Sequence, residues 1–237
     1  MLEFDLEKFR SNTLPSENKI MAGWVGDRDQ PAVSVVCNTF NHERYIEDAI
    51  RGFLIQRTSF PFEIIIHDDA STDNSVKIIK KYEKEYPSII RPIFQKVNQY
   101  SQGKKPTILS FQYTKGEYIA LCEGDDFWVY DGKLQSQWAF LNSHNSLDGC
   151  AHAALCLKPD GKISIINDHN CSILSCSTVC KTGGGVVPTA SLFLRRNVLA
   201  RYASLFSDAP DSQASCWLHW FWLSTYWVTG YEMYQFH

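Results

Sequence analysis

The sequence predicts an α/β protein in which helices flank a mostly parallel central sheet. The first observation is an alternation, because runs with strand character and segments with helical spacing follow one another four times over residues 32–126. The second is that polar or acidic clusters come directly after three of the strand-like runs. In such sheets ligands bind outside the carboxyl ends of the strands, so these clusters are expected to meet at one functional edge.

The elements can be justified in order. Short apolar runs rich in β-branched residues give the expected strands, which are residues 32–36, 62–66, 89–94 and the run that starts at residue 118. Apolar residues at helical spacing give the expected helices, which begin near residue 45, near residue 75 and at residue 107. Ser71, Thr72 and Asp73 are candidate N-caps for the second of these helices.

Beyond the alternation, residues 151–157 and 162–166 read as a hairpin around a Pro-Asp-Gly turn. A Gly-rich loop over residues 181–191 precedes a further strand at residues 192–194. Residues 1–31 are polar and suggest an arm or a short helix outside the main fold. We therefore expect an N-terminal arm and one domain over residues 32–237, with 32–126 as its nucleotide-binding half and 127–237 as its acceptor-side half.

Composition argues against several classes of protein. The net charge of −3 gives no basic surface for a nucleic acid, and no apolar run reaches the roughly 18 residues of a membrane span. The tryptophan-rich run at residues 216–228 fits a buried helix that lines a pocket better than a segment in a membrane interface. Acidic residues follow Met1 where a signal peptide would be basic, so we expect a cytoplasmic protein.

The eight cysteines are too dilute for a small disulfide-stapled protein, and we expect them to be reduced. Cys171, Cys176 and Cys180 could bind zinc together with a nearby histidine. No pair of these cysteines has the CxxC spacing of a zinc knuckle, so scattered core residues are the better interpretation.

Three carboxylates within four residues follow the run at 118–122. Glu123, Asp125 and Asp126 would repel one another unless a cation lies among them, and oxygen-rich clusters suit Mg²⁺ or Mn²⁺. Gly124 lets the backbone or a ligand approach closely. A solvated acidic turn is the alternative, but a second acidic pair at residues 68–69 favours a functional site.

Nucleotide-sugar binding fits these clusters. Carboxylates can hold the metal that bridges a diphosphate, an Asp at the second strand end can accept a hydrogen bond from a pyrimidine N–H, and Phe40 can lie against a base. A dinucleotide-binding domain would need GxGxxG after the first strand, and neither that motif nor a P-loop is present. A receiver domain would carry its acidic pair after the first strand rather than the second.

Three segments carry a resemblance to a known family. VSVVCNTFNHERYIEDAI, FEIIIHDDASTDNS and KGEYIALCEGDDFWVYDGKLQSQ resemble, in order and at the usual spacing, the signature blocks of glycosyltransferase family 2. The resemblance covers residues 32–142 and implies an inverting enzyme with the GT-A fold. The branch with EGDD is common in bacterial surface-polysaccharide gene sets. A helix that starts after Asp131 and is packed by Trp138 and Leu141 is also implied.

The resemblance also implies roles for individual residues. The residues that would bind the nucleotide-sugar are Thr39, Phe40, Asn41, Glu43, Asp68, Asp69, Glu123 and Asp126. Of these, Asp68 would reach the base and Asp69 would support its loop. Asp125 would bind the Mn²⁺ or Mg²⁺ ion. Glu123 stands where the family usually has the first Asp of its DxD motif, which leaves its metal role open.

On the acceptor side, the resemblance makes Thr189, Ala190 and Ser191 candidates, and a flexible connector is the equal alternative. An inverting enzyme also needs a base for the acceptor hydroxyl. Asp211 is the preferred candidate, because its spacing to Tyr234-Gln235-Phe236-His237 resembles the family distance from its catalytic Asp to a Tyr-Arg-x-His segment. Asp208 is the second candidate, and either residue could instead be a surface N-cap.

We therefore expect a metal-dependent inverting glycosyltransferase that transfers a sugar from a UDP-sugar to a hydroxyl of a glycan or lipid-linked acceptor. Association with the inner face of the membrane is an open option, and relatives often continue past the position of His237. Two alternatives stay open. One is a non-catalytic subunit that binds sugar-nucleotides or glycans. The other is a nucleotidyltransferase, which would need a Gly- and Arg-rich loop that does not follow the first strand.

Overall fold

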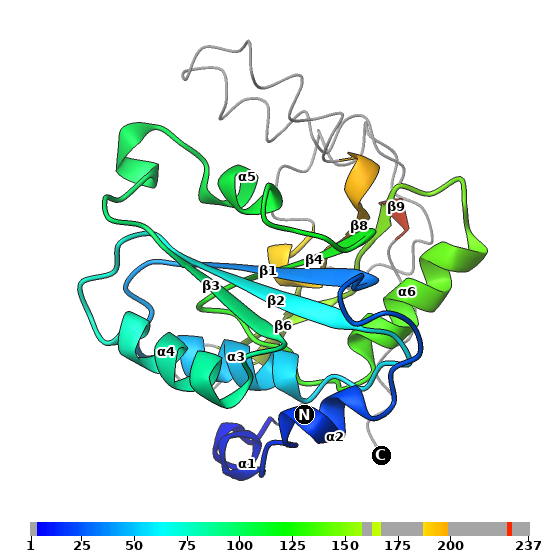
Figure 1. The fold of residues 1–237 in the computed structure, drawn as a ribbon, viewed down its shortest axis with the longest axis horizontal. Helices are drawn as coiled ribbons and strands as arrows, with labels where there is room; N and C mark the ends of the chain where they lie inside the picture. Colours follow the sequence, from blue (N-terminus) through cyan, green and yellow to red (C-terminus); the bar gives the residue numbers. More distant parts are fainter. Residues whose placement is uncertain (1–3, 158–162, 167–186, 199–226, 229–237) are drawn as a thin grey trace.

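The computed structural model describes residues 4–157, 163–166, 187–198 and 227–228 (Figure 1). Within these residues seven strands form one sheet in the order β3-β2-β1-β4-β8-β5-β9, and two form a separate hairpin, β6-β7. The strands are β1 Val33–Thr39, β2 Phe62–Asp68, β3 Ile90–Phe94, β4 Tyr118–Glu123, β5 Gly149–Cys150, β6 Ala154–Leu157, β7 Ile163–Ile166, β8 Phe193–Arg195 and β9 Trp227–Val228. The helices are α1 Leu6–Ser11, α2 Glu17–Met21, α3 Ile46–Leu54, α4 Ser75–Glu85, α5 Pro106–Phe111 and α6 Lys133–Ser143, with the 3₁₀ turns η1 Tyr100–Gln102 and η3 Thr189–Ser191.

The predicted mixed α/β fold with a mostly parallel sheet is confirmed. Strands β3, β2, β1 and β4 are all parallel to one another, and β8 runs antiparallel to both β4 and β5. The register places Thr39 beside Asp68 and Asn38 beside Glu123. The carboxyl ends of β1, β2 and β4 therefore finish at one edge.

Three strands continue past the point where their apolar residues end. The sequence predicts ends at residues 36, 66 and 122, whereas β1, β2 and β4 end at Thr39, Asp68 and Glu123. The backbone ladder continues because hydrogen bonding between strands does not require apolar side chains. As a result, predicted loop residues are fixed on the rigid sheet.

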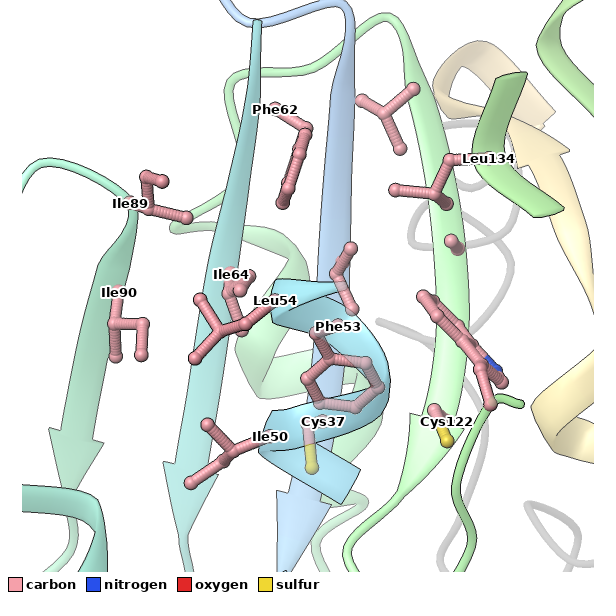
Figure 2. Close-up of a cluster of buried hydrophobic side chains, with 14 of the residues drawn as sticks. Cys37, Ile50, Phe53, Leu54, Phe62, Ile64, Ile89, Ile90, Cys122 and Leu134 are labelled. Carbon is pink, nitrogen blue, oxygen red and sulfur yellow. The ribbon is translucent and has the colours of Figure 1, made fainter. Parts of the chain in front are cut away.

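Both faces of the central strands are buried, as expected for a parallel sheet covered by helices. One face carries Val35, Cys37, Ile64 and Ile66 against α3, α4 and α6, and Figure 2 shows Ile50, Phe53 and Leu54 of α3 over this face. Side chains on the other face belong to a second cluster, which contains Val36, Ile119, Leu121 and Leu194, with Phe111 of α5 packed against it. Because successive side chains of β1 and β4 point to opposite faces of the sheet, neighbouring residues of one strand belong to different core clusters.

The N-terminal segment packs against the main fold, contrary to the expectation of an arm outside it. Ile20 and Met21 of α2 are buried members of the larger core cluster, and Leu14 and Trp24 pack against that cluster. Figure 1 shows α1 and α2 on the outer side of the layer formed by α3 and α4. The segment is polar in sequence because only a narrow stripe of each short helix faces the core. The division of the chain at residue 32 stays a prediction.

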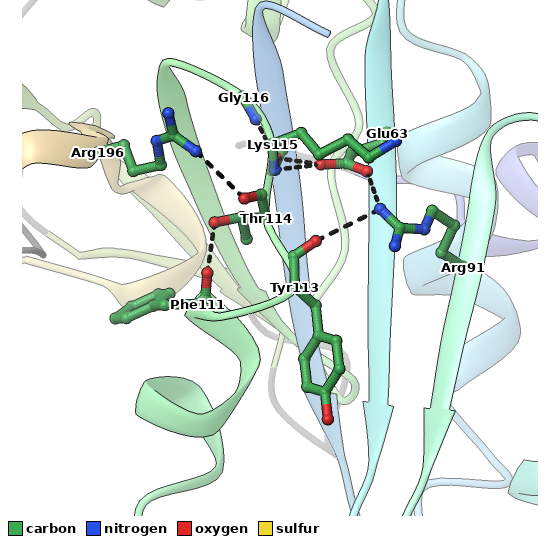
Figure 3. Close-up of polar contacts among 9 residues, drawn as sticks. Glu63, Arg91, Phe111, Tyr113, Thr114, Lys115, Gly116 and Arg196 are labelled. Carbon is green, nitrogen blue, oxygen red and sulfur yellow. Dashed lines mark hydrogen bonds and ion pairs between the residues drawn. The ribbon is translucent and has the colours of Figure 1, made fainter. Parts of the chain in front are cut away.

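A polar network fixes the opposite edge of the sheet, at the amino ends of the strands (Figure 3). The buried Glu63 carboxylate accepts hydrogen bonds from Ser34 Oγ at 2.7 Å, from Lys115 N at 2.7 Å and from Arg91 Nη1 at 2.7 Å. Gly116 N in turn donates to Ser34 Oγ at 2.8 Å. Because every oxygen of this buried carboxylate is paired, the network has a structural role and sets the start of β4.

The remaining local predictions have mixed outcomes. The hairpin is confirmed as β6-β7, and α6 is packed by Trp138 and Leu141 as expected. The cap prediction for α4 is wrong, because its N-cap is Asn74 without a side-chain cap bond. Asp73 accepts instead from Ser75 N at 2.9 Å. Residues 171–180, the 216–226 part of the aromatic run, Asp208, Asp211 and the 234–237 segment lie outside the described residues.

Within the described part of the chain, no helix has the length and apolar character needed to cross a membrane.

Candidate active site

Three predicted clusters meet at the carboxyl edge of β1, β2 and β4. Gly124 N donates to Asn38 O at 2.9 Å, and Asp69 N donates to Thr39 O at 2.9 Å. The first bond continues the pairing of β1 with β4 by one residue, and the second continues the pairing of β1 with β2 by one residue. The sequence prediction that the three clusters share one edge is therefore confirmed.

The loop after β1 is held to the loop after β2 by reciprocal hydrogen bonds. Asn41 N donates to Ser71 Oγ at 2.9 Å, and Asn41 Oδ1 accepts from Thr72 N at 2.8 Å. Glu43 Oε2 accepts from Asn74 N at 3.0 Å and from Asn74 Nδ2 at 2.8 Å. Asn41 has a φ of 56°, in the left-handed region that Asn tolerates better than most residues. Asn41 and Glu43 thus shape the edge by joining its loops.

The two aspartates at the end of β2, Asp68 and Asp69, have different partners. Asp69 is 2 % exposed and accepts from Gln99 N at 2.7 Å and from Tyr100 N at 3.0 Å, so it holds the loop after β3. Asp68 is 1 % exposed, and its Oδ2 accepts from Ser71 N at 3.0 Å. The other oxygen, Oδ1, is buried and has no hydrogen-bond partner among the described residues. An unpaired buried acceptor is costly, about 1–3 kcal/mol, so this atom is available to a donor on a ligand.

Residues 123–128, at and just after the end of β4, form a segment that we call the acidic loop. It concentrates negative charge at the same edge of the sheet. Asp125 has a side chain that is about half exposed, and its Oδ1 lies 3.8 Å from His42 Nδ1. Partial burial and the nearby Asp125 and Asp126 carboxylates raise the pKa of Glu123. Partial burial and Asp125 also raise the pKa of Asp126, and His42 opposes that shift. The like charges therefore destabilise one another in the free protein.

Gly124 allows this loop to lie directly on the end of β1. A Cβ atom at this position would lie 2.7 Å from Thr39 Oγ1 and 2.9 Å from His42 Nδ1. Both of these polar atoms are buried and lack hydrogen-bond partners among the described residues. Together with Asp68 Oδ1, they make three buried polar atoms without a hydrogen-bond partner among the described residues at one edge of the sheet.

His42 is a candidate site residue that the sequence prediction missed. It lies between Asn41 and Glu43 in a loop already assigned to the site, which is the only signal the sequence offered. Its importance depends on the contact with Asp125, which is 83 positions further along the chain (125 − 42).

The acceptor-side candidates lie next to the end of the acidic loop. Trp128 Nε1 donates to Ala190 O at 2.7 Å, and Gln137 Nε2 donates to Ser191 O at 2.9 Å. Ser191 is fully buried, whereas Thr189 and Ala190 are half-buried. The 189–191 segment is therefore anchored through its backbone carbonyls, with Trp128 joining it to the acidic loop.

A buried lysine lies behind Trp128. Lys133 Nζ is 4.1 Å from the centroid of the Trp128 ring and donates to Gln137 Oε1 at 2.6 Å. Burial lowers the pKa of Lys133 to about 7, while the neighbouring Cys122 and Cys150 favour its charged form. This side chain supports the loop from the core side.

The described residues fit a metal ion only with help from a ligand. They contain no group of three His, Cys, Asp or Glu side chains that could hold an ion by themselves. Mg²⁺ and related ions commonly use one or two carboxylates together with substrate phosphates. The half-exposed Asp125 carboxylate, beside two further carboxylates whose charges need compensation, matches such a partial site.

The mostly parallel sheet and its acidic carboxyl edge fit the GT-A fold that the sequence resemblance implies. The sequence model of the family "Glycosyl transferase family 2" matches residues 34–164, which is more than half of the chain. The protein therefore belongs to glycosyl transferase family 2.

Related proteins share this part of the chain. An uncharacterized protein of Mycobacterium tuberculosis is 42 % identical over 129 residues, which cover 54 % of this chain and 37 % of that protein. The putative glycosyltransferase EpsE of Bacillus subtilis is 36 % identical over 114 residues, which cover 48 % of this chain and 40 % of EpsE. The matched part thus spans less than half the length of either relative.

Solved structures share the fold. The crystal structure of residues 1–349 of Staphylococcus aureus TarS in complex with UDP has a TM-score of 0.60 at 19 % identity, covering 84 % of this chain and 61 % of that one. A mannosyltransferase from Pyrobaculum calidifontis in complex with GDP-Man and Mn²⁺ has a TM-score of 0.53 at 15 % identity, covering 83 % of this chain and 51 % of that one. At these identities the likeness concerns the fold alone.

Proposed function

We propose that this protein is a metal-dependent inverting glycosyltransferase that transfers a sugar from a nucleotide-sugar, with UDP as the nucleotide, to a hydroxyl group. The observation that carries the proposal is a group of three buried polar atoms without hydrogen-bond partners among the described residues at the carboxyl edge of the sheet, namely Thr39 Oγ1 and His42 Nδ1 against Gly124 and Asp68 Oδ1 at the end of β2. Unpaired buried groups gathered at the carboxyl edge of a parallel sheet are what a polar ligand there would satisfy.

The nucleoside would bind on the β1 and β2 side of this edge. Asp68 Oδ1 has the position and the free lone pairs to accept a hydrogen bond from the N–H of a uracil ring. Phe40, which is 43 % exposed, offers a ring face against which the base can lie. Asp69 would act indirectly, by holding the backbone of Gln99 and Tyr100 in place.

The diphosphate would bind on the β4 side. Asp125 would hold the divalent cation, with Glu123 near the ribose and Asp126 facing the sugar. When bound, the cation supplies positive charge that neutralises the diphosphate and stabilises it as a leaving group. The mannosyltransferase of similar fold that binds GDP-Man and Mn²⁺ supports this assignment, as do the mutually repelling carboxylates of the loop.

Transfer would take place toward the 189–191 segment. The acceptor hydroxyl would give its proton to a carboxylate, for which Asp211 is the proposed base and Asp208 the second candidate. The oxygen of the acceptor hydroxyl would form the new bond to the anomeric carbon from the face opposite the nucleoside diphosphate. The bond between that carbon and the diphosphate oxygen would break, and inversion of configuration would follow.

The names of relatives suggest the acceptor class. TarS is a poly(ribitol-phosphate) β-N-acetylglucosaminyltransferase, and TuaG of Bacillus subtilis is a putative teichuronic acid biosynthesis glycosyltransferase. We infer a glycan or lipid-linked acceptor in the synthesis of a bacterial surface polysaccharide, reached from the cytoplasm at the inner face of the membrane.

Binding and turnover of UDP-sugars test the proposal. Calorimetry should detect UDP binding that strengthens with Mn²⁺, and Asp125→Ala should abolish the Mn²⁺-dependent part while leaving the unfolding temperature unchanged. Asp29→Ala is the matched control, since Asp29 is an exposed carboxylate in the turn before the amino end of β1. Unchanged affinity in Asp125→Ala would contradict the metal assignment. A protein that binds UDP-sugar but releases no UDP during long incubation with Mn²⁺ would favour a non-catalytic binding subunit.

A further inference from the structure

The N-terminal helix α1 contacts the acidic loop, although it precedes the family match at residues 34–164. Phe4, Phe9 and Phe127 form an aromatic cluster, with ring centroids 5.1 Å apart for Phe9 and Phe127 and 5.7 Å apart for Phe4 and Phe127. Phe9 is 7 % exposed and is the buried residue of α1. Phe127 follows Asp126 directly in the chain, so this cluster holds the end of the acidic loop.

An ion pair between an exposed arginine of α1 and a buried aspartate of α3 joins the two helices. Arg10 binds Asp48 through two nitrogens, with Nε 3.0 Å from Oδ1 and Nη2 2.7 Å from Oδ2. Asp48 is 5 % exposed, and breaking such a pair by removing one partner leaves an uncompensated buried charge. Arg51 of α3 also donates to Asn12 O just after α1. Helix α1 is therefore attached to the core helix, and its position is well defined.

The acidic loop is held from two sides as a result. On the core side, Trp128 packs edge-on against Phe53 of α3, with ring centroids 4.8 Å apart. On the outer side, Phe127 packs against Phe4 and Phe9. Because Glu123, Asp125 and Asp126 repel one another, the loop needs such anchors to keep one arrangement in the absence of a counter-charge.

We propose that α1 is a positioning element for the proposed metal site, and that Phe9 and Arg10 act through Phe127 to hold Asp125 and Asp126 ready for the cation. The inference rests on the proposed function of Asp125. Without the aromatic cluster, the loop would have to lose conformational freedom during binding, and the affinity for the cation and diphosphate would fall. Nucleoside binding at Asp68 would be unaffected, because β2 carries that residue.

Phe9→Ala and Met21→Ala test this separation. Met21 is a matched control, because it is buried to a similar degree, 6 % exposed, in the neighbouring helix α2 and belongs to the core cluster without forming part of the aromatic cluster. Both variants are expected to lower the unfolding temperature. Only Phe9→Ala should weaken Mn²⁺-dependent UDP binding, by about tenfold, while uridine affinity stays at the wild-type level. Phe9→Leu should recover part of the loss.

Phe4→Ala provides a milder variant if Phe9→Ala fails to fold, because Phe4 is only half-buried. Hydrogen exchange over residues 123–128 should be faster in either Phe variant than in Met21→Ala. Wild-type Mn²⁺-dependent affinity in both Phe variants, with Asp125→Ala still defective, would overturn the inference and leave the proposed function intact. UDP binding that is independent of Mn²⁺ in the wild type would overturn both.

Discussion

Gly52 in the last turn of α3 lies against the backbone of Trp128, and its replacement by alanine gives a sharp test of the packing behind the acidic loop. A Cβ atom on Gly52 would lie 2.6 Å from Trp128 N and 2.7 Å from Trp128 O. Real Cβ contacts are longer, so the backbone of residue 128 or the helix must shift. The shift would move the end of the loop that carries Asp125.

Two opposing effects decide the magnitude. Alanine is favoured over glycine in a helix interior by about 1 kcal/mol, which would raise the free energy of unfolding. Forcing extra volume into a packed core costs about 1–3 kcal/mol, and the cost lies toward the upper part of that range when the neighbour is backbone. The expected net change is a destabilisation of about 1–2 kcal/mol, which corresponds to about 2–8 °C in a domain of this size.

Thermal unfolding and UDP calorimetry with Mn²⁺ would measure the two consequences, and Mn²⁺-dependent affinity should fall together with stability. Gly132→Ala is the matched control. Its Cβ would lie 2.6 Å from the Oη and Cζ atoms of Tyr130, but that ring is 41 % exposed and can rotate away. A Gly52→Ala protein that is more stable than wild type, with unchanged affinity, would refute the reasoning.

Three further changes test other parts of the site. Asp68→Ala should weaken uridine and UDP alike, by several-fold to a hundredfold, since the lost bond of about 0.5–3 kcal/mol goes to the base; a calorimetric loss confined to UDP would place Asp68 elsewhere. Lys133 has a folded-state pKa of about 7 against 10.5 when exposed, so unfolding takes up a proton between these pH values and stability gains from this residue as pH rises. Between pH 7 and 10 the free energy of unfolding of the wild type, measured by urea titration, should therefore rise relative to that of Lys133→Met, and parallel profiles would contradict the lowered pKa of Lys133. Asp211→Asn should lower turnover by about 10²–10⁴-fold with little change in donor affinity, whereas Asp208→Asn should cost little; initial-rate kinetics on both variants would identify the base.

The sequence was sufficient to predict the parallel part of the sheet and the edge at which the polar clusters meet. Alternation of strands and helices requires no long-range information, and parallel strands bring their ends together once the topology is known. The clusters at Thr39, Asp68 and Glu123 could therefore be assigned to one edge, and the register confirms that assignment.

Contacts between distant segments could not be predicted. The nearness of His42 and Asp125, and of Phe9 and Phe127, depends on how loops and short helices pack, which leaves no periodic signal in the sequence. Gly52 reads as an unfavourable helix residue until the Trp128 backbone is seen beside it. The packing of the N-terminal helices against the core was missed for a similar reason, because helices of five or six residues bury only one or two side chains each and show no clear period.

Two buried thiols in the central strands offer a probe of how often the sheet opens. Cys37 and Cys122 are neighbours in the register of β1 and β4, and Figure 2 shows Cys37 beneath α3 and Cys122 to one side of that helix. They are 0 % and 1 % exposed, and burial raises the pKa of each thiol well above its ordinary value. A thiol reagent can react with them only when β1 and β4 become accessible, so the labelling rate at low reagent concentration measures the free energy of that opening. If UDP and Mn²⁺ bind at the ends of these strands, they should slow the labelling of both cysteines, since a ligand that prefers the closed form reduces the open population in proportion to its occupancy.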